Sequence, residues 1–191
     1  MVNRIVRSGQ ASTDQSASNE IVYMGIDNGV SGSIGIIRQG RAAMLFMPTR
    51  SELSYTKVKR NITRVDWRLL RELIHTNLPL ELNDNKQFIV PIKVFLERPM
   101  VNPGRFQATA SALRAMEATL IVLEAFKLPL QYVDSKQWQK VMLPGGLKGD
   151  ELKKASHDIG CRLFPNLSGT IDKHKDADGL LMAEWARKER L

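Results

Sequence analysis

The sequence predicts an α/β fold in which one mixed β-sheet is flanked by helices. Short apolar runs separated by turn signals occupy residues 21–47, which is typical of a β-hairpin followed by a third strand. After residue 66, helical and strand-like segments alternate, and this alternation packs helices against a shared sheet. We expect one domain over residues 21–191, preceded by a flexible tail, residues 1–20, that is rich in Ser, Gln and Asn.

The first three predicted strands lie close together in the sequence. Residues 21–27 are apolar and end at a carboxylate, and the Asn28-Gly29 pair that follows indicates a turn. Apolar residues return at 33–37 and again at 42–47, which completes the hairpin and adds a third strand.

Two further strands are predicted later in the chain. Residues 88–96 form a continuous run rich in Val, Ile and Phe, with Pro91 early in it, and such a run is typical of a strand buried on both faces. Residues 130–133 are a second, shorter strand.

Four helices are predicted between and after these strands. Asp66 is a suitable N-cap for a helix that carries Trp67, Leu70 and Ile74 on one face. The next helix is rich in Ala and ends before Pro129, because proline cannot continue a helix. The three later helices are expected at residues 105–127, 150–163 and 176–190.

The charge balance predicts a polyanionic partner. The chain has 28 Lys and Arg against 20 Asp and Glu, a net charge of +8. This excess favours a nucleic acid first and an anionic membrane surface second. Six basic residues and one acid lie between Lys57 and Arg71, so we expect phosphate contacts there rather than only a solvated face.

Cysteine content and hydropathy exclude other classes. Cys161 is the only cysteine, which excludes a disulfide framework within the chain and a thiolate zinc site. An unpaired cysteine suits a reducing intracellular compartment: the cytoplasm, the host cytoplasm for a viral chain, or an organelle. The sequence contains no run of 18 apolar residues and no apolar core of a secretory signal, so neither a membrane span nor a secretory leader is expected.

Three acids stand in otherwise apolar segments. Asp27 and Glu97 each end a predicted strand, and Asp178 shares a helical stripe with Leu181 and Trp185 that should face the core. A lone carboxylate in such a place is costly unless it is paired or bound to a cation. Each acid alone has an ordinary interpretation as a turn cap or as a charge at a helix N-terminus. All three together, in a basic protein, favour a shared site.

Carboxylates that converge need a divalent cation, and hard oxygen ligands favour Mg²⁺ or Mn²⁺. Two such ions about 4 Å apart can activate water and stabilise the leaving oxygen in phosphodiester cleavage.

Several segments in order resemble the RuvC-like Holliday-junction resolvases, which have the RNase H fold. The resemblance covers residues 21–187 and is strongest to phage and chloroplast-type members. It rests on YMGIDNGVSGSIGII, VFLERP, KKASHDIGCRLFP and KHKDADGLLMAEWA, and on the basic stretch MPTR…VKRNITRVDWRLLRELI.

The resemblance implies a Mg²⁺-dependent, homodimeric endonuclease that acts in DNA recombination and repair, with Mn²⁺ as a possible substitute. Such an enzyme resolves four-way DNA junctions by paired symmetric nicks through metal-activated water. The implied metal ligands are Asp27, Glu97 and Asp178. For the fourth group, the spacing of four residues before the last acid favours His174 over Asp176.

The resemblance also implies roles for residues outside the acid set. Lys153 matches a lysine that lies near the scissile phosphate, although it can equally lie on a solvated helix face. The Ala-rich helix after the VFLERP strand helps to build a homodimer in the family, or else packs on its own sheet, and Trp138 is expected to be structural. Phe106 stacks on an unpaired base or packs into the core. The expected DNA contacts are Lys57, Lys59, Arg60, Arg64, Arg105 and Phe106.

Three other functions remain open at the level of the sequence. An RNase H-fold nuclease can act on flaps, forks or RNA–DNA hybrids, and a basic protein can bind DNA without cutting it. The segment GIDNGVSGSIG also resembles the phosphate-binding hairpin of actin-like ATPases. Those proteins need about twice this length and a second copy of the hairpin, which the sequence does not contain.

Overall fold

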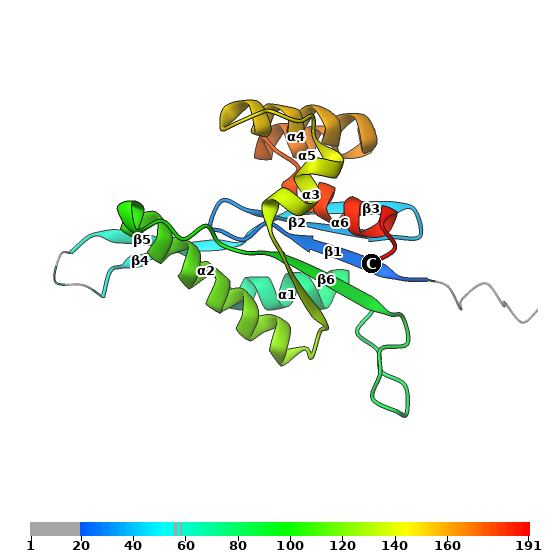
Figure 1. Cartoon of the computed structure of the whole chain (residues 1–191). Helices are drawn as coiled ribbons and strands as arrows, with labels where there is room; N and C mark the ends of the chain where they lie inside the picture. Colours follow the sequence, from blue (N-terminus) through cyan, green and yellow to red (C-terminus); the bar gives the residue numbers. More distant parts are fainter. Residues whose placement is uncertain (1–19, 56, 58) are drawn as a thin grey trace, which may run out of the picture.

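The computed structural model describes residues 20–55, 57 and 59–191 (Figure 1). The predicted tail, residues 1–20, lies outside the described residues except for Glu20. No helix in the described part of the chain is both long enough and apolar enough to cross a membrane.

A five-stranded mixed sheet in the order β3-β2-β1-β6-β7 forms the centre of the molecule. β1 pairs antiparallel with β2, and β2 pairs antiparallel with β3, while β6 and β7 continue parallel to β1. An antiparallel meander on one side of the first strand and parallel strands on the other is the arrangement of the RNase H-like fold. The predicted fold class is therefore confirmed. The strands of this sheet are β1 (Val22–Ile26), β2 (Ser33–Arg38), β3 (Arg41–Phe46), β6 (Ile92–Glu97) and β7 (Leu130–Val133).

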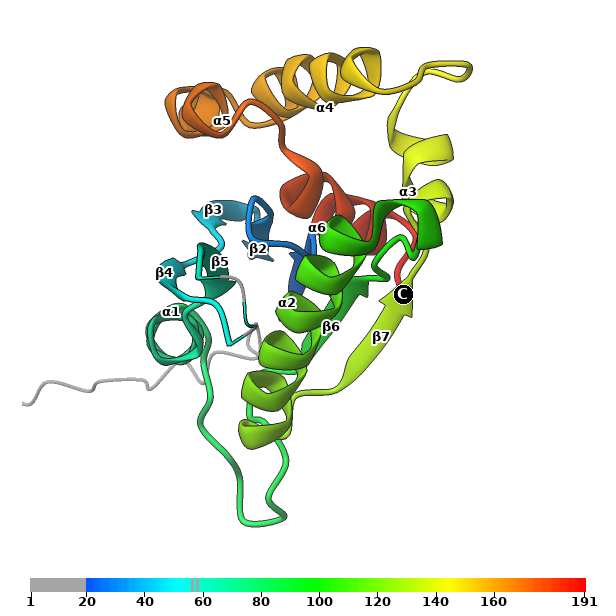
Figure 2. The same cartoon turned by 90° about the vertical axis from the view of Figure 1, so that its left-hand side faces the viewer.

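Helices cover both faces of the sheet. In Figure 1, α1 and α2 lie below the sheet and α6 lies against its upper face, with α3, α4 and α5 above or beside it. Figure 2 shows α4 and α5 as an outer layer beyond α6. Alternate residues of each strand enter two buried clusters, one under α1 and α2 and one under α3 and α6. The helices are α1 (Trp67–Asn77), α2 (Phe106–Ala125), α3 (Ser135–Met142), α4 (Asp150–Leu163), α5 (Ser168–His174) and α6 (Asp178–Lys188).

Several sequence predictions of local structure are confirmed. The backbone N–H groups of Arg68 and Leu69 donate to Oδ1 of Asp66 at 3.1 and 3.3 Å, so Asp66 caps α1. The predicted helix 150–163 has the bounds of α4. The predicted strand 130–133 has the bounds of β7.

Other boundaries were wrong. The predicted strand 88–96 begins only at Ile92, because Pro91 has no N–H for the ladder and contributes only its carbonyl, which accepts from the Val22 N–H. The predicted helix 105–127 is a 3₁₀ turn over Pro103–Arg105 followed by α2, and it ends at Ala125.

The predicted helix 176–190 starts at Asp178, and the shorter helix α5 precedes it. Lys175 separates the two helices, because its backbone adopts a left-handed conformation with φ of 78°.

The basic stretch before α1 contains an antiparallel hairpin that the sequence analysis missed. It consists of β4 (Thr49–Leu53) and β5 (Asn61–Val65). Most of its residues are polar and exposed, so no apolar alternation marks it in the sequence.

Backbone-to-backbone contact joins α6 to the β1–β2 hairpin. A Cβ on Gly25 would lie 2.3 Å from the carbonyl oxygen of Gly179, and a Cβ on Gly35 would lie 2.2 Å from the Cα of Leu180. These distances are far shorter than a van der Waals contact, so only a hydrogen atom fits at either glycine. The contact places the N-terminus of α6 at the end of β1.

A side chain at this contact should destabilise the fold. Gly25→Ala forces α6 away from the sheet, and we expect a loss of about 3 kcal/mol in the free energy of unfolding. Urea unfolding at neutral pH measures it. The control is Gly169→Ala on α5, where nothing lies within 4 Å of the new Cβ, and there a change of less than about 1 kcal/mol is expected. Equal stability of both variants would contradict the packing argument.

Candidate metal centre and active site

Two acids lie side by side at the carboxyl ends of parallel strands. Asp27 directly follows β1, and Glu97 is the last residue of β6. The two strands are parallel neighbours in which Ile26 pairs with Leu96, so the next residue of each chain segment leaves the sheet at the same edge.

Two more acids reach this edge from the segment that joins α5 to α6. Asp176 lies in that segment, and Asp178 is the first residue of α6. Ligand oxygens of Asp27, Asp176 and Asp178 all lie within 4.8 Å of one another. Glu97 is not a member of this group of three, but it ends the strand next to Asp27, and its charge raises the pKa of Asp27.

The four carboxylates repel one another where water is scarce. Loss of water by burial raises the pKa of Asp27 well above its usual range, and the charges of Glu97, Asp178 and Asp176 add to the effect. Burial likewise raises the pKa of Glu97 to about 7 and that of Asp178 to about 6. Nearby cations and hydrogen-bond donors compensate these carboxylates only in part, because burial has the larger effect on each pKa, and a bound cation would compensate them further.

The donor set fits a hard divalent cation. All the converging atoms are carboxylate oxygens, which Mg²⁺ and Mn²⁺ prefer. A divalent cation would also reverse the electrostatic penalty that raises these pKa values.

Two buried side chains hold the carboxylates in place. Ser156 on α4 donates from Oγ to Oδ1 of Asp178 at 2.5 Å and accepts from the Ala177 N–H at 3.0 Å. Trp138 on α3 donates from Nε1 to Oε2 of Glu97 at 3.1 Å. The sequence analysis gave Trp138 only a structural role, and the structure adds a contact with a site carboxylate.

His174 contacts two acceptors. Its Nε2 lies 3.1 Å from the carbonyl oxygen of Gly32, and its Nδ1 lies 3.0 Å from Oδ1 of Asp176. Both contacts favour the imidazolium form, and the pKa of His174 is raised, chiefly by Asp176. The structure thus brings Asp176 into the acid group, and His174 lies beside Asp176, with Nδ1 at ion-pair distance from it and Nε2 near the Gly32 carbonyl.

Lys153 is exposed on α4 and lies near the acids. Its charge lowers the pKa of Asp27 and of Asp178, in opposition to the larger effect of burial. A cation in this position can also contact a phosphate that approaches the carboxylates.

The β4–β5 hairpin and the start of α2 lie together. The Arg60 guanidinium donates to Oε1 of Gln107, and Arg114 donates to the Tyr55 hydroxyl at 3.2 Å. These contacts bring predicted DNA-binding residues of the hairpin next to the 105–107 segment.

Other predicted DNA-binding residues differ in their surroundings. Phe106 is 70% exposed, so it is a surface residue and not part of the core. Arg64 forms an ion pair with Glu52, which also pairs with Arg50 at 3.0 Å. Lys57, Lys59 and Arg105 are exposed.

No family model matches the sequence, and no curated protein matches it. Among solved structures, the chain is similar to RuvC of Thermus thermophilus in complex with Holliday junction substrate, with a TM-score of 0.48 and 11% identity over 88% of this chain and 96% of that chain. A second Thermus thermophilus RuvC structure has a TM-score of 0.37 and 14% identity over the same shares. Because these scores are low, the fold class rests on strand order and direction.

The pKa shifts predict that the metal-free protein loses stability as the pH rises. The folded state binds protons more tightly than the unfolded state, so stability falls between the ordinary carboxyl pKa, about 4, and the raised values near 6 and 7. Asp27→Asn removes one charge from the group. In EDTA at pH 8 we expect it to raise the free energy of unfolding by about 1–3 kcal/mol.

Urea unfolding across pH 5–8 tests this. The gain from Asp27→Asn should shrink toward pH 5, where the wild-type carboxylates are protonated. Asp84→Asn, in the exposed loop before β6, is the control and should show no such dependence. A gain that stays constant with pH would contradict the electrostatic origin.

A second prediction concerns Trp138. Its hydrogen bond favours the ionised form of Glu97, so Trp138→Phe should raise the pKa of Glu97 further above about 7. Protons then compete with the cation at higher pH, and the pH midpoint of Mg²⁺ binding should rise by about one unit. Calorimetric titration with Mg²⁺ between pH 6 and 9 measures it.

Trp185→Phe is the matched control, because Trp185 belongs to the same buried cluster and packs edge-on against Phe95. It should leave the midpoint unchanged. Identical midpoints for both variants and the wild type would show that Trp138 acts through packing alone.

Proposed function

We propose that this protein is a metal-dependent endonuclease that resolves four-way DNA junctions by paired symmetric nicks. One observation carries the proposal. Carboxylate oxygens from β1 and from the start of α6 converge within 4.8 Å, with Glu97 of β6 beside them, in a chain with a net charge of +8. An acidic centre within a basic protein is the arrangement expected of an enzyme that holds phosphates and cuts them through bound cations.

The acids would hold Mg²⁺, or Mn²⁺ in its place, through Asp27, Asp176 and Asp178, with Glu97 as a further ligand. A metal held there would lower the pKa of a water molecule and stabilise the leaving oxygen, and cleavage of this kind would leave 5′-phosphate and 3′-hydroxyl ends. Lys153 orients the scissile phosphate from α4.

Three neighbouring side chains act on the ligands and not on the substrate. Ser156 fixes Asp178, Trp138 fixes Glu97, and His174 fixes Asp176 through the contacts described above. Rigid carboxylates keep the distance between substrate and attacking water short, which is a large part of the catalytic effect in such sites.

The hairpin and the start of α2 form the proposed DNA surface. Lys57, Lys59 and Arg60 contact phosphates near the hairpin tip, and Arg64 adds a contact once it leaves Glu52. Arg105 and Phe106 face the junction centre, where the exposed ring can stack on an unpaired base.

A homodimer follows from the symmetry of the substrate. A four-way junction is nearly two-fold symmetric, so a dimer with the same symmetry places two sites for paired nicks. The α2 side of the molecule offers an apolar surface for this contact. Trp67, Leu113 and Ile121 are each more than 40% exposed.

The choice of junctions over other nucleic acids rests on the ordered set of resolvase-like segments. The hairpin, the strand ending in Glu97 and the last helix of the resemblance are the elements that supply the acids. Flaps, forks and RNA–DNA hybrids are the alternative substrates, and each is tested beside the four-way junction. DNA binding without cleavage is the alternative function.

The decisive experiment incubates a synthetic four-way junction with the protein and Mg²⁺, with and without EDTA, and maps the cuts at nucleotide resolution. We expect symmetric pairs of nicks in Mg²⁺ and none in EDTA. Asp27→Asn should keep junction binding and lower the cleavage rate at least about a thousandfold, since it removes a metal ligand. Asp84→Asn is the control.

Normal cutting by Asp27→Asn would contradict the site. Unpaired cuts, or faster cleavage of flaps or hybrids than of junctions, would contradict the substrate while leaving the site intact. Tight binding without any cutting in Mg²⁺ or Mn²⁺ would show a DNA-binding protein that is not an enzyme.

A further inference from the structure

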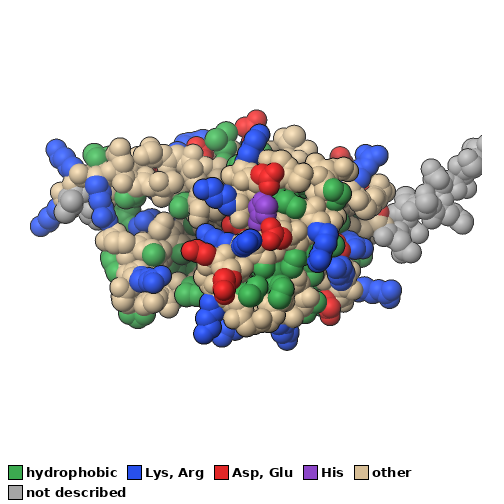
Figure 3. Space-filling view, turned by 90° about the horizontal axis from the view of Figure 1, so that it is seen from above, with side chains coloured by type: hydrophobic (Ala, Val, Ile, Leu, Met, Phe, Trp, Pro, Cys, Tyr) green, Lys and Arg blue, Asp and Glu red, His purple; other side chains and the backbone are tan. Residues whose placement is uncertain are grey.

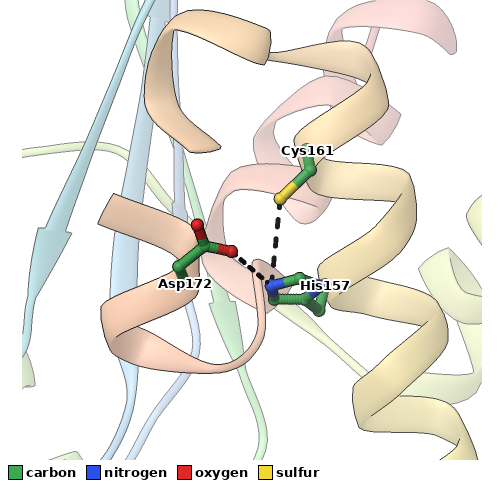
Figure 4. Close-up of side chains that lie close together, drawn as sticks. All are labelled: His157, Cys161 and Asp172. Atoms are coloured by element: carbon green, nitrogen blue, oxygen red, sulfur yellow. Dashed lines mark hydrogen bonds and ion pairs between the residues drawn. The ribbon is translucent and has the colours of Figure 1, made fainter. Parts of the chain in front are cut away.

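A second cluster of metal-ligating side chains lies on the outer layer of the molecule. His157 and Cys161 are four residues apart on α4 and therefore share one face of that helix. Asp172 on α5 points toward them from the opposite side (Figure 4). Figure 3 looks down on this layer and shows histidine and acidic side chains together among lysines and arginines.

The three ligand atoms converge at the histidine ring. Nε2 of His157 lies 2.8 Å from Oδ1 of Asp172 and 3.9 Å from Sγ of Cys161 (Figure 4). One ligand atom from each residue lies within 4.8 Å of the other two. Tetrahedral zinc with ordinary bond lengths separates such ligand atoms by about 3.4–3.6 Å. The Nε2–Oδ1 distance of 2.8 Å is shorter than this separation and the Nε2–Sγ distance of 3.9 Å is longer, so the side chains would rearrange by about half an ångström or more to take the metal.

A fourth residue gives the histidine the orientation of a metal ligand. Nδ1 of His157 lies 3.0 Å from Oδ1 of Asp158. A histidine that ligates a metal through one nitrogen usually donates its other N–H to a carboxylate, which fixes the ring and makes it a stronger ligand. Asp158 occupies that place, and Nε2 faces Cys161 and Asp172.

We propose that His157, Cys161 and Asp172 bind a zinc ion, with a fourth position open to water. The donors are nitrogen, sulfur and oxygen, a set that suits Zn²⁺ and is poor for Mg²⁺. The two metal sites would thus differ in chemistry. The cysteine count excludes a zinc site built of several thiolates, whereas the proposed site uses one thiolate, so zinc binding here would overturn the broader exclusion drawn from the sequence.

A metal here would tie α4 to α5. α4 carries Lys153 and Ser156, which contact or influence the acid group, and α5 ends at His174, which contacts Asp176. The bound ion would therefore restrain both helices that position the last two acids. This proposal does not rest on the proposed nuclease activity, because metal binding is measured without DNA.

Cobalt spectroscopy tests the site directly. Co²⁺ replaces Zn²⁺ in such sites and gives a thiolate-to-cobalt charge-transfer band, which only Cys161 can supply because the chain has no other cysteine. The full-length protein titrated with Co²⁺ should show this band at one equivalent per thiol, and Zn²⁺ should abolish it. The acid group at the sheet edge contributes no such band.

Variants assign the ligands. His157→Asn and Asp172→Asn should weaken Zn²⁺ binding at least tenfold, and Asp158→Asn by about tenfold through the histidine. Asp150→Asn, an exposed acid at the start of the same helix, is the matched control and should bind as the wild type does. Zn²⁺ should also protect Cys161 from alkylation in the wild type and the control, but not in His157→Asn.

Absence of the band in the wild type would overturn the proposal. A band that persists unchanged in both His157→Asn and Asp172→Asn would also overturn it, since cobalt would then bind the thiol without these ligands. Circular dichroism of each variant confirms that the helices are intact, so a lost band reports on the ligand and not on unfolding.

Discussion

The direct backbone contact between α6 and the β1–β2 hairpin is the constraint on which the site depends. Gly25 and Gly35 leave no side chain between helix and sheet, so the helix lies closer than ordinary side-chain packing allows. Asp178 is the first residue of this helix and Asp27 directly follows β1. If any side chain widened the gap, the two carboxylates would separate by the same amount. The packing of α6 on the sheet and the placement of the two carboxylates therefore depend on the same backbone positions, Gly25, Gly35, Gly179 and Leu180.

The buried carboxylates of the site destabilise the folded protein. Burial and mutual repulsion raise the pKa values of Asp27, Glu97 and Asp178, which means that their charged forms are less favourable in the folded chain than in water. The rest of the fold must offset this cost. Two layers of apolar packing, one on each face of the sheet, supply the stabilising free energy that offsets it. The geometry of the acids is held by neutral donors, Ser156 and Trp138, which orient carboxylates without neutralising them.

Sequence reasoning reached the fold class and the strand-end acids because both leave local signals. Asp27 and Glu97 interrupt apolar runs, and a buried carboxylate is conspicuous in any such run. The sequence could not predict that Asp176 joins the acid group while His174 contacts Asp176. This arrangement depends on the left-handed turn at Lys175, which has no glycine to mark it, whereas the preference for His174 came from the residue spacing in the resembling family. The β4–β5 hairpin was also not predicted, because its register is set by pairing between polar strands and not by an apolar face.

The ion pairs of Glu52 affect how the β4–β5 hairpin can bind a polyanion. It sits between Arg50 and Arg64 and pairs with both at once. If Arg64 contacts a phosphate as proposed, Glu52 can keep its ion pair with Arg50, so its carboxylate does not lose both partners. In such an exchange, a phosphate would replace the Glu52 carboxylate at the Arg64 guanidinium. In the free protein Glu52 thus holds both arginines, and Arg64 could contact a phosphate while the Arg50–Glu52 ion pair remains.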